Sequence, residues 1–235
     1  MKVVILAGGK GSRISFYTQK IPKPMIKIGN IPLLVHIMNI YEFYGFNDFI
    51  IAAGYKSKII KDYFLRNKKH KNIKVVQTGT NSMTGERILK LKKFLDKEDN
   101  FLLTYGDGVT NLNINKVLKF HLKHKKIATV TAVRPPVKFG ELTIGKNNNV
   151  KKFLEKPQLN EGWINGGFFV LNKKIFKYLR GKNLVFEKKP LSNLSKDGEL
   201  KAYMHNSYWR CMDNLNEKNH LEDIYRKNRT LWKIK

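Results

Sequence analysis

Short apolar segments alternate with amphipathic segments along the first half of the chain. The apolar runs predict strands at Val3–Leu6, Asp48–Ala53, Ile73–Gln77, Phe101–Tyr105 and Ala128–Val133. Apolar residues that recur at helical spacing predict helices at Leu33–Tyr44, Ile59–Leu65, Thr84–Leu95 and Ile114–His124. Strand and helix in alternation indicate parallel strands joined by right-handed crossovers, so the sequence predicts a doubly wound α/β sheet.

The pattern changes in the second half of the chain. Two short strands, Leu142–Ile144 and Val150–Phe153, flank the segment GKNNN and predict a hairpin. Later segments predict three strands and a closing helix, at Gly167–Leu171, Glu199–His205, Tyr208–Met212 and Glu217–Lys227. We therefore expect a small antiparallel C-terminal extension at one edge of the same sheet. Neither an internal repeat nor a linker-like tract divides the 235 residues, which predicts a single domain.

Composition narrows the class of protein. With 42% hydrophobic residues, the chain is long enough and apolar enough to bury a sizeable core. It has neither an apolar run of transmembrane length nor a signal-peptide pattern. The single cysteine, Cys211, excludes a disulfide framework and a cysteine-based zinc site. These features predict a soluble cytoplasmic protein that does not act on a membrane.

The net charge of +28 comes from 46 Lys and Arg against 18 Asp and Glu. Clustered basic residues would indicate a nucleic-acid partner, whereas an AT-rich genome would raise Lys, Asn and Ile together. The lysines are spread along the whole length, which favours the second explanation over a nucleic-acid-binding protein. A positive field would still concentrate anionic substrates such as nucleotides and sugar phosphates.

A glycine-rich loop, AGGKGSR, follows the first predicted strand. Glycines there let backbone amides approach phosphate oxygens, and Arg13 adds a fork of donors. The loop matches neither the GxGxxG nor the P-loop pattern, and a tight strand-to-helix turn would explain it as well. Further along, Lys23 stands between Pro22 and Pro24, which restrict its backbone and help to aim its ammonium at phosphate charge.

Two aspartates are candidate ligands of a hard cation. Asp107 follows a predicted strand in the segment YGDG, and Asp213 follows the apolar segment YWRCM. Two carboxylates at strand ends suit Mg²⁺ bound to the phosphates of a nucleotide. Each aspartate alone is better explained as a turn or cap residue, and the metal site is favoured only when the two aspartates are taken together with the glycine loop.

Two further segments carry groups that suit a sugar phosphate. FLEKP contains Glu155 and Lys156, and WINGG contains Asn165 and Gly166. A strand-end salt bridge and a tight hairpin loop are the structural alternatives. His121 and His124 lie three residues apart on a predicted helix, where a solvated face is favoured over a metal pair.

The blocks LAGGKGSR, KPM, GDG, FLEKP and NGGFFVL, in this order, resemble the sugar-1-phosphate nucleotidyltransferases. Within that superfamily, SMTGERILKL, LLTYGDGV and YWRCMDN are most similar to the glucose-1-phosphate cytidylyltransferases. The resemblance extends from Met1 to about Trp232.

The resemblance implies a Rossmann-like mixed sheet and an Mg²⁺-dependent reaction. CTP and glucose 1-phosphate would give CDP-glucose and pyrophosphate, so CTP and a sugar 1-phosphate would be the partners. Residues 1–133 would form the nucleotide-binding part, and residues 134–235 the sugar-binding part with the closing helix. Another sugar phosphate, another nucleotide (dTTP, UTP, GTP) and a homo-oligomer stay open.

The resemblance also implies a role for each candidate residue. Arg13 and Lys23 would be catalytic, Asp107 and Asp213 would hold Mg²⁺, and Glu155, Lys156, Asn165 and Gly166 would bind the sugar phosphate. The residues implied to bind the nucleotide are Leu6, Ala7, Gly8, Gly9, Gly11, Ser12, Arg13, Ser82, Thr84, Arg87 and Gly106.

The sequence departs from the family pattern at several of these segments. Ser12 replaces the usual threonine, Glu86 stands inside a GGR-like segment, and Cys211 replaces the proline of PMDT. The segment between Phe64 and Ile73 is short, where these enzymes typically carry an insertion associated with subunit contacts.

Overall fold

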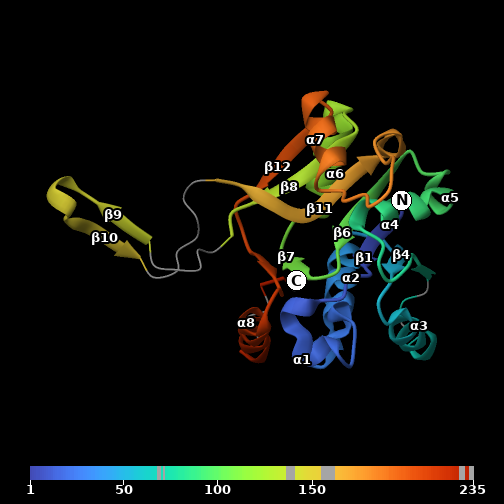
Figure 1. The fold of residues 1–235 in the computed structure, drawn as a ribbon, viewed down its shortest axis with the longest axis horizontal. Helices are drawn as coiled ribbons and strands as arrows, with labels where there is room; N and C mark the ends of the chain where they lie inside the picture. The colour runs from blue at the N-terminus through green and yellow to red at the C-terminus, as the bar shows by residue number, and fades with distance from the viewer. Residues whose placement is uncertain (68–69, 71, 136–140, 155–161, 228–230, 233–235) are drawn as a thin grey trace.

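The computed structural model describes residues 1–67, 70, 72–135, 141–154, 162–227 and 231–232. Its centre is a seven-stranded sheet in the order β12-β8-β11-β6-β1-β4-β5 (Figure 1). Six of these strands run in one direction, and β11 is antiparallel to both of its neighbours. The strands of this sheet are β1 (Val3–Ala7), β4 (Asp48–Ala53), β5 (Asn72–Gln77), β6 (Asn100–Tyr105), β8 (Ala128–Val133), β11 (Ile164–Asn172) and β12 (Leu200–His205).

Helices cover both faces of the sheet and enclose two hydrophobic clusters. Alternate residues of β1 divide between them: Val3 and Ile5 face one cluster, and Val4 and Leu6 face the other. The first cluster lies under α2 (Leu33–Phe43), α3 (Ser57–Arg66), α6 (Ile114–His124) and α8 (Leu215–Arg226). The second lies under α4 (Thr84–Lys90), α5 (Lys92–Leu95), η4 (Lys173–Lys177) and α7 (Lys189–Lys196). A sheet covered on both sides explains why its inner strands, such as β1 and β4, read as continuous apolar runs.

Shorter elements surround the sheet. Three pairs of strands form separate two-stranded ribbons, β2 (Lys27–Ile28) with β3 (Ile31–Pro32), β7 (Gly108–Thr110) with β13 (Trp209–Cys211), and β9 (Glu141–Ile144) with β10 (Val150–Leu154). The remaining helices are η1 (Ser12–Ile14), α1 (Ser15–Thr18), η2 (Lys23–Met25) and η3 (Lys146–Asn148).

The mixed α/β class is confirmed, but the second-half strands do not sit where we expected. β11 lies inside the sheet between β6 and β8, and β12 pairs parallel with β8 at the edge. Phe168, Phe169, Val170 and Leu171 are all buried, as a strand covered on both faces requires. The expected hairpin is present as β9–β10 and stands apart from the seven-stranded sheet (Figure 1).

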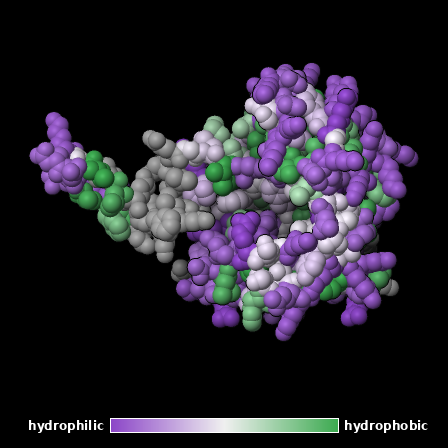
Figure 2. Space-filling view, in the orientation of Figure 1, coloured by the Kyte–Doolittle hydropathy of each residue, from purple (hydrophilic) through white to green (hydrophobic). Residues whose placement is uncertain are grey.

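The surface is consistent with charged residues that are dispersed rather than clustered. Hydrophilic residues are spread over the visible face of the body, and hydrophobic colour gathers on the β9–β10 hairpin (Figure 2). Its exposed apolar residues are Leu142, Ile144, Val150 and Phe153. Among the described helices, none has the length and apolar character needed to cross a bilayer.

Candidate active site

The candidate site lies at the carboxyl ends of β1 and β6, which are neighbours in the sheet. This is the edge at which open α/β sheets bind ligands. Because β11 runs antiparallel, its beginning rather than its end reaches the same edge, with Asn165 opposite Ala132 of β8. The direction of one strand therefore brings the NGG segment beside the glycine loop.

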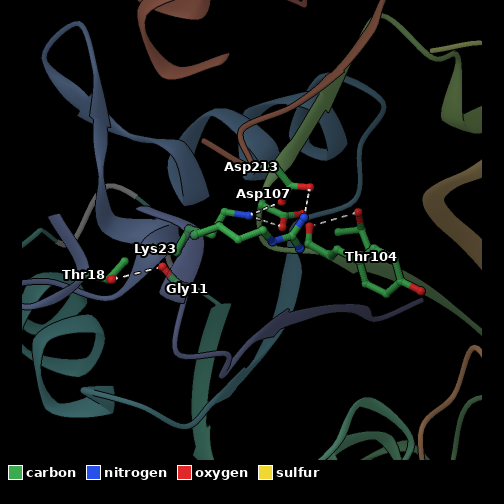
Figure 3. Close-up of polar contacts among 8 residues, drawn as sticks. Gly11, Thr18, Lys23, Thr104, Asp107 and Asp213 are labelled. Carbon is green, nitrogen blue, oxygen red and sulfur yellow. Dashed lines mark hydrogen bonds and ion pairs between the residues drawn. The ribbon is translucent and has the colours of Figure 1, made fainter. Parts of the chain in front are cut away.

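The glycine loop is shaped by a left-handed turn at Gly11. Gly11 has φ +66°, which glycine adopts without strain, and a Cβ there would lie 2.8 Å from Cγ2 of Thr18. The hydroxyl of Thr18 donates to the Gly11 carbonyl at 3.1 Å (Figure 3). These contacts hold the loop against α1 and set the direction in which Ser12 and Arg13 leave it.

Arg87 supports this loop from below. Its side chain is 4% exposed, and the guanidinium donates to Thr78 Oγ1 at 2.6 Å, to the Gly79 carbonyl at 2.8 Å and to the Gly8 carbonyl at 2.9 Å. The resemblance implies that Arg87 binds the nucleotide, and Arg87 does line a cavity beside the glycine loop. Its donors are nevertheless directed at the protein, so Arg87 shapes the loop on which a nucleotide would rest.

This arrangement predicts different effects for two adjacent glycines. A Cβ at Gly8 would overlap the guanidinium of Arg87, whereas a Cβ at Gly9 meets no atom within 4 Å. Gly8→Ala is expected to lower the free energy of unfolding by about 1–3 kcal/mol, as crowding in a packed region does. Thermal unfolding would then shift down by roughly 3–10 °C. Gly9→Ala is the matched control and should unfold within a degree or so of the parent; equal shifts in both would contradict the Arg87 contact.

Four charged groups from distant segments meet at the centre of the site. Lys23 Nζ lies 2.7 Å from Asp107 Oδ2 and 2.7 Å from Asp213 Oδ1 (Figure 3). Arg13 Nη1 lies 2.7 Å from the other oxygen of Asp213. The structure thus brings together all four residues for which a catalytic or metal-binding role is predicted.

A small ribbon explains why the two aspartates are neighbours. Asp107 immediately precedes β7, and Asp213 follows β13 by two residues. These strands pair antiparallel with Gly108 opposite Cys211, and the Met212 amide donates to the Asp107 carbonyl at 2.8 Å. Lys23 enters from η2, which starts after the extended Pro22 and has Pro24 in its first turn.

The electrostatics of the cluster favour its charged forms. Burial on its own lowers the pKa of Lys23, but the charge of Asp107 and hydrogen bonds to both carboxylates raise that pKa above its usual 10.5. For Asp213, burial works toward a higher pKa, but Lys23 and Arg13 outweigh it and the pKa lies below its usual 3.8. The Lys23 ammonium is therefore stabilised in its charged form by the two ion pairs.

The donor set fits a hard divalent cation. Asp107, Asp213 and Cys211 each offer a ligand atom within 4.8 Å of the others. Two carboxylates completed by substrate phosphates and water are the usual setting for Mg²⁺ in proteins, whereas a thiol is a soft ligand that Mg²⁺ does not select. Burial raises the pKa of the Cys211 thiol, and the charge of Asp107 adds to this effect, so it remains protonated beside the carboxylates.

Two cavities adjoin this cluster. The first has a volume of about 460 Å³, within the range of small-ligand sites. It is lined by every residue for which a nucleotide-binding role is implied, from Leu6 to Gly106, together with Lys23, Asp107 and Asp213. The second, of about 290 Å³, is lined by Asn165, Gly166, Gly167 and Trp209. Arg13, Tyr105, Asp107 and Asp213 border both cavities.

Other predicted residues have mixed outcomes. Ser82 and Thr84 line the first cavity, and their hydroxyls donate to the Thr78 carbonyl and to Glu187 respectively. Glu155 and Lys156 lie outside the described residues.

The two histidines on α6 hydrogen bond within the fold. The ring of His121 bonds to Thr129 and Asn100, and that of His124 to Thr129. Both rings are committed to these contacts, so neither the metal pair nor a purely solvated face describes them.

Sequence reasoning missed two polar side chains of the first cavity, Tyr105 and Glu187. Tyr105 stands directly before the GDG segment. Its position two residues from Asp107 was therefore a signal in the sequence that it lies at the site. Glu187 lies in the loop before α7 and reaches the cavity through bonds to Thr84 and Tyr105. No spacing or motif around it indicates that position.

The fold and the site together define a nucleotide-binding enzyme of the mixed α/β type. The family profile described as "Nucleotidyl transferase" matches residues 2–214, and the chain belongs to this family.

Individual relatives and solved structures are similar to the chain over nearly its whole length. The chain is 40% identical to the glucose-1-phosphate cytidylyltransferases of Salmonella typhimurium and Salmonella typhi, covering 99% of each chain in both comparisons. Among solved structures, it is similar to HddC from Yersinia pseudotuberculosis at 26% identity with a TM-score of 0.76, covering 95% of this chain and 99% of that one. HddC has also been solved in complex with GMP-PN, and that structure matches with a TM-score of 0.74 over the same shares.

Proposed function

We propose that the protein transfers a cytidylyl group from CTP to glucose 1-phosphate, giving CDP-glucose and pyrophosphate. The observation that carries this proposal is the shared boundary of the two cavities. Arg13, Asp107 and Asp213 face both, so two phosphorylated substrates held side by side would meet at this charged cluster. The Salmonella relatives, whose names specify cytidylyl transfer to glucose 1-phosphate, support the choice of nucleotide and sugar.

The chemistry is a direct displacement. A phosphate oxygen of glucose 1-phosphate forms a bond to the α-phosphorus of CTP, and the bond from that phosphorus to the oxygen bridging to the β-phosphate breaks. Pyrophosphate leaves with the electron pair of that bond, and no covalent enzyme intermediate is needed. Catalysis then consists of alignment and charge stabilisation.

The residues of the chain divide this work. Backbone amides of the glycine loop and Arg13 bind the triphosphate, and Lys23 stabilises the charge that develops on the reacting phosphates. Asp107 and Asp213 would hold Mg²⁺, which when bound supplies further neutralisation of the nucleotide's charge. Asn165 and Gly166 line the side on which the sugar would lie.

The proposal keeps the division into a nucleotide part, residues 1–133, and a sugar part with the closing helix, residues 134–235. Two residues of the second part, Glu187 and Asp213, also line the first cavity, so the division describes binding surfaces rather than separate domains. The reaction would proceed in the cytoplasm, where nucleoside triphosphates are made. A homo-oligomer stays part of the proposal without a residue assigned to its interface.

The test is pyrophosphate release by the purified protein with Mg²⁺ and glucose 1-phosphate, with CTP, UTP, dTTP, GTP and ATP offered separately. Release with CTP alone is expected. Release with another nucleotide would support the same reaction but contradict CTP as the substrate. The HddC structure in complex with GMP-PN is the reason to include GTP. Absence of release with all five would contradict glucose 1-phosphate as the acceptor, and a panel of sugar 1-phosphates would follow. If that panel also failed, the nucleic-acid alternative would be tested next.

A further inference from the structure

Tyr105 connects the two cavities through a line of hydrogen bonds. Its hydroxyl donates to Glu187 Oε1 at 2.5 Å, and Thr84 Oγ1 donates to Glu187 Oε2 at 2.6 Å. On the other side, Asn165 Nδ2 donates to the Tyr105 hydroxyl at 3.2 Å. The line runs from the start of α4 in the first cavity to the start of β11 in the second.

The ring of Tyr105 is fixed by its surroundings. Gly167 has φ +77°, and a Cβ there would lie 2.6 Å from Cδ2 of Tyr105. The ring also packs edge-on against Phe169, with 5.9 Å between the centroids. A glycine is therefore required at 167 to admit the ring, and the hydroxyl has little freedom to leave its two partners.

The direction of these bonds follows from the chemistry of the groups. An ionised carboxylate only accepts hydrogen bonds, whereas a tyrosine hydroxyl has one hydrogen to donate and lone pairs to accept. Glu187 therefore takes the hydrogen of Tyr105 and leaves its oxygen as an acceptor toward Asn165.

Asn165 is oriented at both ends as a result. Its Nδ2 faces the Tyr105 oxygen, and its Oδ1 accepts from the Gly167 amide at 2.8 Å. One Nδ2 hydrogen is used by Tyr105, which leaves the second as a donor. Asn165 lines the second cavity, where that donor suits a hydroxyl or phosphate oxygen of a sugar phosphate.

We propose that Glu187 is a positioning residue for the sugar half of the reaction: through the Tyr105 hydroxyl it fixes the Asn165 amide so that an N–H is presented to the sugar phosphate. The inference rests on the proposed function for the identity of the sugar phosphate. The orientation itself rests only on the contacts above. Thr84 holds the other oxygen of Glu187, so the carboxylate is anchored in the nucleotide cavity while it acts on the sugar cavity.

Kinetics of three variants test the role of this line. Tyr105→Phe removes the acceptor for Asn165 and is expected to raise the KM for glucose 1-phosphate about five- to tenfold, the size of one lost hydrogen bond. The KM for the nucleotide should stay within about twofold. Glu187→Ala should raise the KM for glucose 1-phosphate by about three- to tenfold. Glu187→Gln keeps an acceptor oxygen, so its KM for glucose 1-phosphate should be close to that of the parent.

The double variant Glu187→Ala/Tyr105→Phe separates positioning from direct contact. If Glu187 acts through Tyr105, the KM of the double variant for glucose 1-phosphate should be no higher than that of Tyr105→Phe alone. Additive losses would show that Glu187 acts independently and would overturn the inference. Tyr178→Phe is the matched control, because the Tyr178 hydroxyl also donates to a carboxylate, that of Asp197 at 2.7 Å, away from both cavities.

A second measurement reads the orientation without turnover. The side-chain amide signals of Asn165 in a ¹⁵N–¹H spectrum are identified by their loss in Asn165→Asp. They are expected to shift in Tyr105→Phe and in Glu187→Ala, and to stay in place in Tyr178→Phe. Unmoved signals in Glu187→Ala would overturn the positioning role. Shifted signals with an unchanged KM for glucose 1-phosphate would overturn the role in sugar binding.

Failure of the proposed function would be visible in the parent protein alone. If the parent releases pyrophosphate with a nucleotide other than CTP, or with another sugar 1-phosphate, the same variants are compared on that pair. The choice of substrates is then decided by the parent, and the positioning role by the differences among variants.

Discussion

Lys23→Met is expected to lower kcat for pyrophosphate release by about 10²–10³-fold, the usual loss when one group that stabilises transition-state charge is removed. The Lys23 side chain is only 12% exposed and its ammonium lies 2.7 Å from both Asp107 and Asp213. Methionine has nearly the same length without the charge. Positions of the glycine loop and of the aspartates should be retained, so the loss should fall on kcat more than on KM for either substrate.

The same variant is expected to bind a divalent cation more tightly in the absence of nucleotide. The Lys23 ammonium occupies carboxylate oxygens that the cation would use. Its removal leaves Asp107 without this ion pair and leaves Asp213 with only Arg13 beside it, so the site becomes more negative. Titration with Mn²⁺ as the probe should show an affinity at least about tenfold higher than in the parent. A tenfold change in affinity is the same free-energy difference as a shift of about one pKa unit. Lys20→Met, an exposed lysine of the same segment, is the control for both measurements. Unchanged kcat would remove Lys23 from the reaction, and unchanged Mn²⁺ affinity would contradict its competition with the metal.

Local pattern was sufficient for most elements of the fold. The strands Asp48–Ala53 and Ala128–Val133 and the helix Ile114–His124 have the predicted bounds, because a buried run or an amphipathic repeat is set by neighbours in the sequence. The predicted helix Thr84–Leu95 is instead two helices, since Leu91 has φ −89° and ψ −4° and makes a turn between them. Both helices keep their apolar side toward the core. The helical periodicity of the sequence therefore continues across the turn at Leu91 and does not reveal it.

Strand order was beyond the reach of periodicity. The GFFVL segment reads as a buried strand in any central position, and nothing within it specifies insertion between β6 and β8. That position depends on contacts with β6 and β8, both of which precede β11 in the chain, with partner residues more than 30 positions apart. It matters for function, because only an antiparallel strand at this place directs Asn165 toward the site.

The site divides in the same way. Glycines after a strand, a lysine between prolines and aspartates at strand ends have local signatures, and the structure collects Gly11, Lys23, Asp107 and Asp213 around one cavity. Glu187 has no such signature, because its role depends on a tyrosine 82 residues away and a threonine 103 residues away. Arg87 shows the converse: a motif locates it at the cavity but does not reveal that its donors are directed at backbone carbonyls.

Asp107→Asn is expected to abolish turnover, by about 10³-fold or more, while leaving the fold intact. An amide has the shape of the carboxylate but no charge, so it would be a weak ligand for Mg²⁺ and would no longer compensate Lys23. The Asp107 backbone contact with Met212 does not involve the side chain and should survive, which keeps β7 and β13 paired. Pyrophosphate release, thermal unfolding and Mn²⁺ binding should therefore show lost activity, a small change in stability and weakened metal binding.

Asp99→Asn is the matched control, since Asp99 immediately precedes the same strand, β6, and its side chain is 81% exposed and paired with Lys173. It should have the activity and the Mn²⁺ affinity of the parent. Full activity in Asp107→Asn would remove Asp107 from the metal site. Lost activity with unchanged Mn²⁺ affinity would instead assign Asp107 to the placement of Lys23. The double variant Lys23→Met/Asp107→Asn separates these two cases. If Asp107 is a metal ligand, the double variant should lose the tighter Mn²⁺ binding of Lys23→Met, and if Asp107 only places Lys23, it should keep that tighter binding.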